Sequence, residues 1–147
     1  MQKTVSPAQV QALIQTYLSS PYTLQGHRLC LKDRPETVPV HFPERWAMVT
    51  ACNPHSQKLA AALNQQRNAA LSEAIQNLGC LFYGYRAGEG DWEEAGFLIQ
   101  DISLAASVRL GKNFQQNAVL YGTGNRVALV WLEPLLLIRM WWGGLTR

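Results

Sequence analysis

The stretch that decides the fold spans residues 80–100 and reads CLFYGYRAGEGDWEEAGFLIQ. Its two ends, Cys80 to Arg86 and Glu94 to Gln100, are rich in aromatic and branched apolar residues, which favours β-strands. The segment between them is rich in glycine and acidic residues, which is typical of a hairpin turn. Its negative charge would repel a phosphate group, so the glycines do not indicate a nucleotide-binding loop.

Helices and strands alternate on both sides of this hairpin. Before it, Trp46 to Ala51 predicts a buried strand, and Asn53-Pro54 can begin a helix that continues to Leu78, where Gly79 can end it. After it, the pattern predicts a further helix and a second hairpin, over residues 103–114, 117–121 and 126–132. From residue 46 the order is therefore βαββαββ, which predicts an α+β fold with a ferredoxin-like split βαβ core.

The chain is expected to form one globular domain with three segments. Residues 1–45 predict an N-terminal helix and an irregular arm packed on the core, because three prolines follow within residues 35–43. Residues 46–133 predict the ferredoxin-like core, and residues 134–147 an apolar C-terminal extension. This extension is too apolar for a free tail, so we expect it to cover the sheet or to form a homo-oligomer contact, with membrane-surface anchoring as a third alternative. The residues that would make the contact are Leu135, Ile138, Trp141 and Trp142.

Composition and charge argue against several classes of function. The net charge is +3, but the 13 Lys and Arg are spread along the chain and form no basic stripe, which argues against a nucleic-acid partner. No apolar run approaches the roughly 20 residues that a transmembrane helix needs. Residues 1–20 lack the apolar core of a signal peptide, and the three well-separated cysteines suit reduced thiols, so we expect a cytoplasmic protein.

The expected middle helix places an arginine within its apolar face. At about 100° per residue, the apolar residues from Leu63 to Leu78 share one arc, and Arg67 lies inside it together with Asn64. A guanidinium at that position must meet a carboxylate, backbone carbonyls, a bound anion or solvent. Arg67 therefore has two interpretations, a structural ion pair or a ligand contact, and Glu94 is the expected partner in both.

Further polar residues are expected at one edge of the sheet. In the usual strand order of this fold, the end of the first core strand lies beside the starts of the third and fourth, which brings Asn53, Glu94 and Gln116 together. The junction from Asn53 to Ser56 also precedes the expected helix, where free N–H groups could hold an anion, although helix capping explains the same residues.

Three other patterns carry weaker functional hypotheses. Cys52 lies beside the expected helix start, but no histidine is positioned by the sequence to activate it as a nucleophile. His27, Cys30, Cys52 and His55 together resemble a zinc set, yet residues three apart on an extended segment point to opposite faces. The aromatic residues at 82–85 lack the basic surround of an RNA-binding sheet. We therefore assign no catalytic residue, metal or cofactor.

Four spaced motifs carry a family resemblance. They are Thr50-Ala-Cys-Asn-Pro-His-Ser56, Asn64-x-x-Arg67-Asn68-x-x-Leu71 closed by Gly79, Trp92-Glu-Glu94 to Phe97-Leu-Ile99, and Phe114-Gln-Gln-Asn-Ala-Val119. Over roughly residues 17–132 the chain resembles a bacterial family known only as domain of unknown function 3293, so the resemblance implies no activity. It implies that seven residues occupy the polar positions of the family's pattern: Asn53, Ser56, Asn64, Arg67, Glu94, Gln116 and Asn117.

These residues lead to two hypotheses about function. The first is a polar pocket at the sheet edge that binds a small anionic or amide-bearing ligand. In it, Arg67 would supply charge, Glu94 would orient Arg67 or act as a general base, and Asn53 with Gln116 would supply amide hydrogen bonds. The alternative is a non-catalytic protein-interaction or homo-oligomeric module that uses the apolar C-terminal segment. The sequence assigns no reaction to either.

Overall fold

The computed structural model describes residues 6–144, which form three α-helices, one 3-10 turn and eight strands. In chain order these are α1 (Pro7–Ser19), β1 (Tyr22–Leu24), β2 (His27–Lys32), β3 (Trp46–Val49), η1 (Pro54–Ser56), α2 (Ala61–Asn77), β4 (Phe82–Glu89), β5 (Trp92–Gln100), α3 (Leu104–Asn113), β6 (Ala118–Thr123), β7 (Arg126–Leu132) and β8 (Leu135–Gly144). Within these residues, none of the helices has the length and apolar character needed to cross a bilayer.

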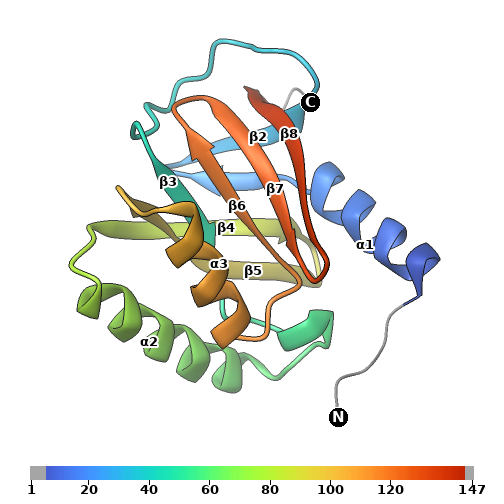
Figure 1. The fold of residues 1–147 in the computed structure, drawn as a ribbon, viewed down its shortest axis with the longest axis vertical. Coiled ribbons are helices and arrows are strands. Elements are labelled where there is room, and N and C mark those ends of the chain that lie inside the picture. The colour runs from blue at the N-terminus through green and yellow to red at the C-terminus, as the bar shows by residue number, and fades with distance from the viewer. Residues whose placement is uncertain (1–5, 145–147) are drawn as a thin grey trace.

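The eight strands form one closed antiparallel barrel (Figure 1). Their order around it is β1-β2-β8-β7-β6-β3-β5-β4, and pairing of β1 with β4 completes the circle. The expected ferredoxin-like fold is therefore wrong. That fold leaves two sheet edges free, whereas here β1 pairs with β4, β8 pairs with β7, and β2 joins β1 to β8.

One hydrophobic core fills the inside of the barrel. Strand alternation points Trp46 of β3 and Trp142 of β8 inward, and both are fully buried. Phe42, from the segment between β2 and β3, stacks on both indoles, with ring centroids 5.1 Å from Trp46 and 5.3 Å from Trp142. These large rings fill one end of the barrel.

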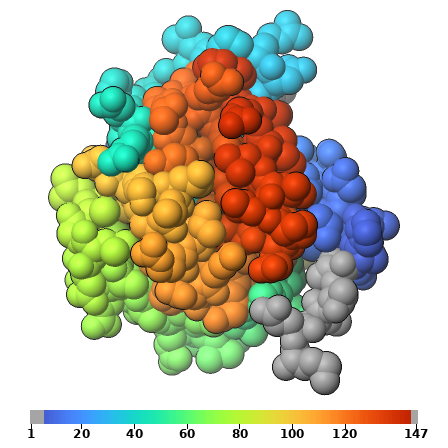
Figure 2. Space-filling view, in the orientation of Figure 1, coloured from blue at the N-terminus to red at the C-terminus, as the bar shows by residue number. Residues whose placement is uncertain are grey.

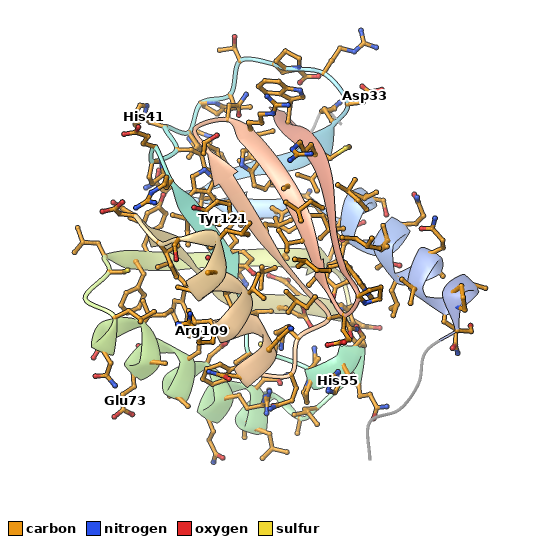
Figure 3. The ribbon with its side chains drawn as sticks, viewed as in Figure 1. Asp33, His41, His55, Glu73, Arg109 and Tyr121 are labelled. Carbon is orange, nitrogen blue, oxygen red and sulfur yellow. The ribbon has the colours of Figure 1, made fainter. Side chains whose placement is uncertain are left out.

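A second core lies outside the barrel, beneath α2 and α3. Leu71 and Ile75 of α2 and Leu110 of α3 pack against the outward-facing residues of β3, β5, β6 and β7. Tyr121 of β6 lies in this layer and donates a hydrogen bond to the Ile102 carbonyl, and Arg109 points outward from α3 (Figure 3). The two helices thus cover one side of the barrel, and α1 lies at the opposite side (Figure 1).

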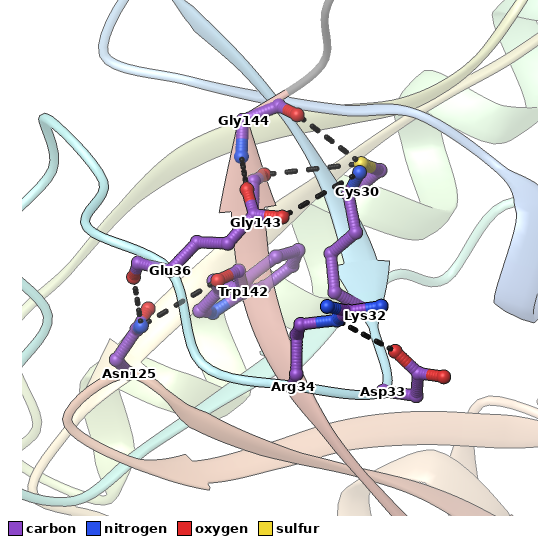
Figure 4. Close-up of polar contacts among 9 residues, drawn as sticks. All are labelled: Cys30, Lys32, Asp33, Arg34, Glu36, Asn125, Trp142, Gly143 and Gly144. Carbon is purple, nitrogen blue, oxygen red and sulfur yellow. Dashed lines mark hydrogen bonds and ion pairs between the residues drawn. The ribbon is translucent and has the colours of Figure 1, made fainter.

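The C-terminal segment is a barrel strand that pairs on both sides. β8 pairs with β7 over residues 135–141 and with β2 over residues 141–144, so it closes the seam between the two. Around that seam, Asn125 donates to the Glu36 carbonyl at 2.9 Å, and the Glu36 carboxylate accepts the Gly144 N–H at 3.2 Å (Figure 4). Trp142, expected at an oligomer contact, is buried inside the barrel. Seen from outside, β8 forms a broad part of the molecular surface (Figure 2).

The connection from β3 to α2 differs from the continuous helix expected from residue 54. Asn53, His55 and Ser56 have φ values of 50°, 51° and 61°, which reverse the chain in a short 3-10 turn. The chain then extends before α2 begins at Ala61. Asparagine tolerates the left-handed conformation better than most residues, which explains its use at position 53. This detour carries Asn53 and Ser56 to the open end of the barrel.

Candidate functional site

A cavity of about 220 Å³ occupies the end of the barrel that the large rings leave free. Its lining comes from α1, from η1 and from strands β1, β3, β4, β5, β6 and β7, and it includes the exposed Thr16 and Trp92. The cavity therefore reaches the surface between α1 and the β4–β5 hairpin. Apolar side chains form most of the wall, and the polar side chains that line it are Thr16, Tyr17, Ser20, Tyr22, Thr50, Ser56, Tyr85, Glu94 and Gln116.

Glu94 is the acid of this cavity, and Asn53 holds it in place. The Asn53 amide donates to Glu94 Oε2 at 2.8 Å, whereas Oε1 has no hydrogen-bond partner among the described residues. Burial raises the pKa of the Glu94 carboxyl, and the hydrogen bond from Asn53 opposes that shift. The site therefore contains a largely desolvated carboxyl with one oxygen available.

Two further side chains that line the cavity are more than nine-tenths buried and keep an unpaired polar atom. Tyr85 of β4 is 8% exposed, and its hydroxyl has no hydrogen-bond partner within residues 6–144. Gln116 is also 8% exposed, and its amide nitrogen donates to the Cys52 and Phe114 carbonyls at 3.0 and 3.2 Å. These two bonds fix the amide orientation and leave the oxygen Oε1 as a free acceptor.

Tyrosines from α1 and β1 complete the polar part of the wall. The Tyr22 hydroxyl donates to the Tyr17 carbonyl at 2.9 Å, which ties the end of α1 to the barrel. The Tyr17 hydroxyl lies near Ser56 and Asn117, whose hydrogen bonds oppose the rise in pKa that burial causes. Burial also raises the pKa of Tyr85 well above 10. All three phenols are therefore neutral at physiological pH.

The structure brings together most of the residues predicted for the site. Asn53 is the centre of the group, since its backbone N–H donates to Asn64 Oδ1 at 2.9 Å and its own Oδ1 accepts from Asn64 at 2.9 Å. Asn117 donates to the Ser56 hydroxyl at 2.8 Å. Glu94, Gln116 and Ser56 line the cavity itself, whereas Asn53, Asn64 and Asn117 support them from behind.

Arg67 does not join this cavity. Its Nε donates to the Ala51 carbonyl at 2.6 Å, and Nη2 donates to the Phe114 carbonyl at 2.5 Å and to Gln115 Oε1 at 3.0 Å. The expected pairing with Glu94 is absent, because backbone carbonyls before η1 and before β6 occupy the guanidinium instead. Its guanidinium therefore ties α2 to the end of β3 and to the segment before β6.

The weaker cysteine and histidine hypotheses find no matching geometry. Cys52 is buried, with its thiol 3.4 Å from the Ala95 carbonyl and 3.3 Å from the Asn68 amide. Cys30 lies in the β2–β8 seam near the Gly143 and Gly144 carbonyls (Figure 4). His55 is exposed on η1 (Figure 3). Within residues 6–144, no three His, Cys, Asp or Glu side chains are grouped so that they could hold a metal ion.

The sequence interpretation missed the aromatic residues of the cavity. Tyr17, Tyr22, Tyr85 and Trp92 all line it, and none was among the predicted site residues. A signal existed for one of them, since residues two apart on a strand share a face and place Tyr85 opposite Gly96 and next to Glu94. That face could be recognised as an interior one only with knowledge that the sheet closes.

Comparison with known proteins adds a family and no function. No curated protein and no solved structure gives a significant match to the chain. Residues 49–119 match the model of the family described as "Protein of unknown function (DUF3293)". This range runs from the end of β3 into β6, and so contains Asn53, Arg67, Glu94 and Gln116. This match supports the family resemblance expected from the sequence motifs, over residues 49–119.

Proposed function

We propose that this chain binds a small, mostly apolar molecule inside the barrel, beside Glu94. The observation that carries the proposal is the cavity of about 220 Å³ whose lining includes Tyr85, Glu94 and Gln116, each with an unpaired polar atom. These atoms face the cavity, where solvent or a ligand can reach them, and they have no protein partner within residues 6–144. A ligand in the cavity would supply hydrogen-bond partners for them, and an eight-stranded barrel is wide enough to hold one small ligand.

The chemistry of the wall narrows the earlier hypothesis of an anionic or amide-bearing ligand. Among residues 6–144, no Lys, Arg or His lines the cavity, and Arg67 is engaged by carbonyls elsewhere. An anion would therefore lie beside Glu94 with no positive charge to offset the repulsion. A ligand that donates hydrogen bonds, as an amide N–H does, fits the unpaired acceptors. No reaction is part of this proposal.

The cavity volume limits the size of the ligand. An apolar cavity of about 150 Å³ in another protein holds a benzene molecule. A cavity of about 220 Å³ has room for one ring with a short polar substituent. We therefore expect a ligand much smaller than a nucleotide or a peptide.

Replacement of Ala87 tests the proposal, because Ala87 lines the cavity and a larger side chain there fills it. Native mass spectrometry of freshly purified protein, followed by a fragment screen detected by amide NMR shifts, should reveal small molecules that bind the natural chain. Ala87→Phe should abolish this binding, and Ala105→Phe, on the exposed face of α3, should not. Equal binding by both variants would place the ligand elsewhere, and no binder at all would reject the proposal.

Self-association through β8 is a second candidate, because three consecutive leucines are solvent-exposed there. Leu135, Leu136 and Leu137 are 54%, 44% and 38% exposed, which is unusual for a run of large apolar residues. Light scattering of the natural chain should then give the mass of a dimer, and Leu135→Ser with Leu137→Ser should restore the monomer mass. A monomer at every concentration tested would reject this candidate.

We also propose a cytoplasmic location, which rests on the cysteines. Cys30, Cys52 and Cys80 are all free thiols in the structure. Disulfides persist in oxidising compartments and are rare in the cytosol. Fractionation of cells that express the chain should then recover it with the cytosolic proteins, and recovery from another fraction would contradict this part of the proposal.

A further inference from the structure

The free polar atoms of the cavity are mainly hydrogen-bond acceptors. Glu94 Oε1 and Gln116 Oε1 have no partner among the described residues, and the Gln116 nitrogen is already committed to two carbonyls. The Tyr85 hydroxyl can accept as well as donate. Three unpaired acceptors in one cavity call for a ligand with several donors.

A protonated amine is the small group that best meets this requirement. An ammonium carries three N–H donors and no acceptor. Each donor can therefore bond one of these acceptors, and the ammonium brings no acceptor of its own next to them. A carboxylate would bring further acceptors toward Glu94, and an alcohol brings only one donor. Hydrogen bonds in which both partners are charged are also shorter and stronger than those between neutral groups.

Four aromatic residues line the same cavity as this carboxyl. Tyr17 of α1, Tyr22 of β1, Tyr85 of β4 and Trp92 of β5 all line the cavity. The faces of such rings attract cations, and enclosures of several aromatic rings recognise ammonium groups in other proteins. Lys58 lies 6.0 Å from the Trp92 ring centroid, but it is exposed, donates to the Asp91 carbonyl and is not part of the lining. The part of the chain that the structure describes therefore supplies no cation to this enclosure.

We propose that the ligand is a small organic cation, a protonated amine on a compact apolar body, whose ammonium meets Glu94, Gln116 and Tyr85 inside the barrel. This inference rests on the proposed function and names the class of ligand. The apolar body would lie against the aliphatic part of the wall, which Met48, Leu120 and Leu129 provide.

The ionisation of Glu94 agrees with this class of ligand. Burial raises the pKa of its carboxyl by removing water from the negative charge, and the single hydrogen bond from Asn53 opposes this rise. The titratable groups around it are the tyrosines of α1, β1 and β4, which are neutral at physiological pH. A bound ammonium would be the positive charge that this carboxyl lacks, so binding should lower its pKa.

Three probes of nearly equal shape separate charge from size: 2-phenylethylamine, 2-phenylethanol and phenylacetate. Calorimetry with the natural chain at neutral pH should give an affinity for the amine that is about tenfold or more above that for the alcohol. Phenylacetate should not bind measurably. Competition among the three, followed by NMR shifts of the indole N–H groups, should place the amine and the alcohol in the same cavity.

Two variants and one matched control identify the residues that select the cation. Glu94→Gln should reduce amine affinity about tenfold or more and leave alcohol affinity within about threefold. Tyr85→Phe should weaken the amine by a smaller factor without removing the ring. Glu93→Gln is the control, because Glu93 is the neighbouring acid on the outer face, where it pairs with Arg86 at 2.5 Å. It should bind all three probes like the natural chain.

Each outcome has a defined meaning. If the alcohol binds as tightly as the amine, or if Glu94→Gln leaves amine affinity unchanged, the inference is wrong while binding in the barrel stands. Preference for phenylacetate would also overturn it. If Glu94→Gln does not fold, the natural chain decides, since amine affinity should fall as acid protonates Glu94 and alcohol affinity should not. Failure of all three probes to bind rejects the inference, whereas the proposed function is judged by the Ala87→Phe comparison.

Discussion

The phenol ring of Tyr85 lies against the α-carbon of Gly96, its partner across the β4–β5 ladder. A β-carbon built on Gly96 would lie 2.6 Å from ring carbon Cε1 and 2.7 Å from the hydroxyl oxygen. Position 96 therefore has to lack a side chain so that Tyr85 can lie flat across the inside of the sheet. This packing places the Tyr85 ring in the cavity wall beside Glu94.

Gly96→Ala should destabilise the protein by about 1–3 kcal/mol, because the added methyl group overpacks the ring of Tyr85. Urea unfolding followed by far-UV circular dichroism measures this change. Gly84→Ala is the control on the neighbouring strand, where an added β-carbon meets nothing closer than 3.9 Å. Tyr85→Leu should recover part of the loss in the double variant. Equal effects of Gly96→Ala and Gly84→Ala would contradict the packing argument.

Arg67→Met should lower the free energy of unfolding by about 2–3 kcal/mol, since hydrogen bonds to charged groups contribute about 1.5–3 kcal/mol each and two carbonyls lose their donor. The change is measured by urea unfolding, with Arg109→Met on the exposed face of α3 as control. Stability that is unchanged or raised in Arg67→Met would instead indicate that the charge of Arg67 serves a ligand.

The local order of the core could be predicted from the sequence, but the closure of the barrel could not. In one half of the barrel the order is β6-β3-β5-β4, which places the end of β3 beside the start of β5, as the split βαβ argument assumed. That argument does not say whether β4 and β6 stay unpaired at the edges of the sheet or pair with further strands. The sequence did not predict β8, the strand that joins β7 to β2, because Leu135 to Leu137 form an unbroken apolar run without the alternation typical of a strand.

The candidate site could also be predicted only in part from the sequence. Asn53 and Glu94 meet because their positions depend only on the neighbouring strands β3 and β5. The predicted partner of Arg67 was wrong, because the helical wheel gives the direction of a side chain and not which backbone carbonyls lie there. The wheel also placed Leu63 and Leu78 in the core, yet they are 48% and 47% exposed, since α2 touches the barrel over a narrow stripe.

Glu94→Gln should stabilise the ligand-free protein increasingly as pH rises. The folded-state pKa of Glu94 lies above the ordinary value of 4.5, so the folded protein binds the proton more tightly than the unfolded chain does. The associated stability is complete below pH 4.5 and is lost as pH rises through the raised pKa. Glutamine removes this dependence. Melting temperatures at about pH 4 and pH 7.5 measure it, and a difference between the two proteins that does not grow with pH would refute the assignment.

Trp142→Ala should cost about 3–5 kcal/mol, as large deletions in a packed core do, and should show that the C-terminal segment belongs to the barrel. Trp142 is fully buried, stacks on Phe42 at 5.3 Å and contacts the Tyr22 ring edge-on at 5.4 Å, so its loss empties the end opposite the cavity. Urea unfolding gives the change in stability, and the near-UV circular dichroism signal from the stacked rings should weaken with it. Trp92→Ala is the matched control, since Trp92 is 40% exposed at the cavity mouth, and it should cost less than about 1 kcal/mol. If Trp142→Ala unfolds like the natural chain but changes the mass seen by light scattering, the segment is an oligomer contact and the barrel does not depend on it.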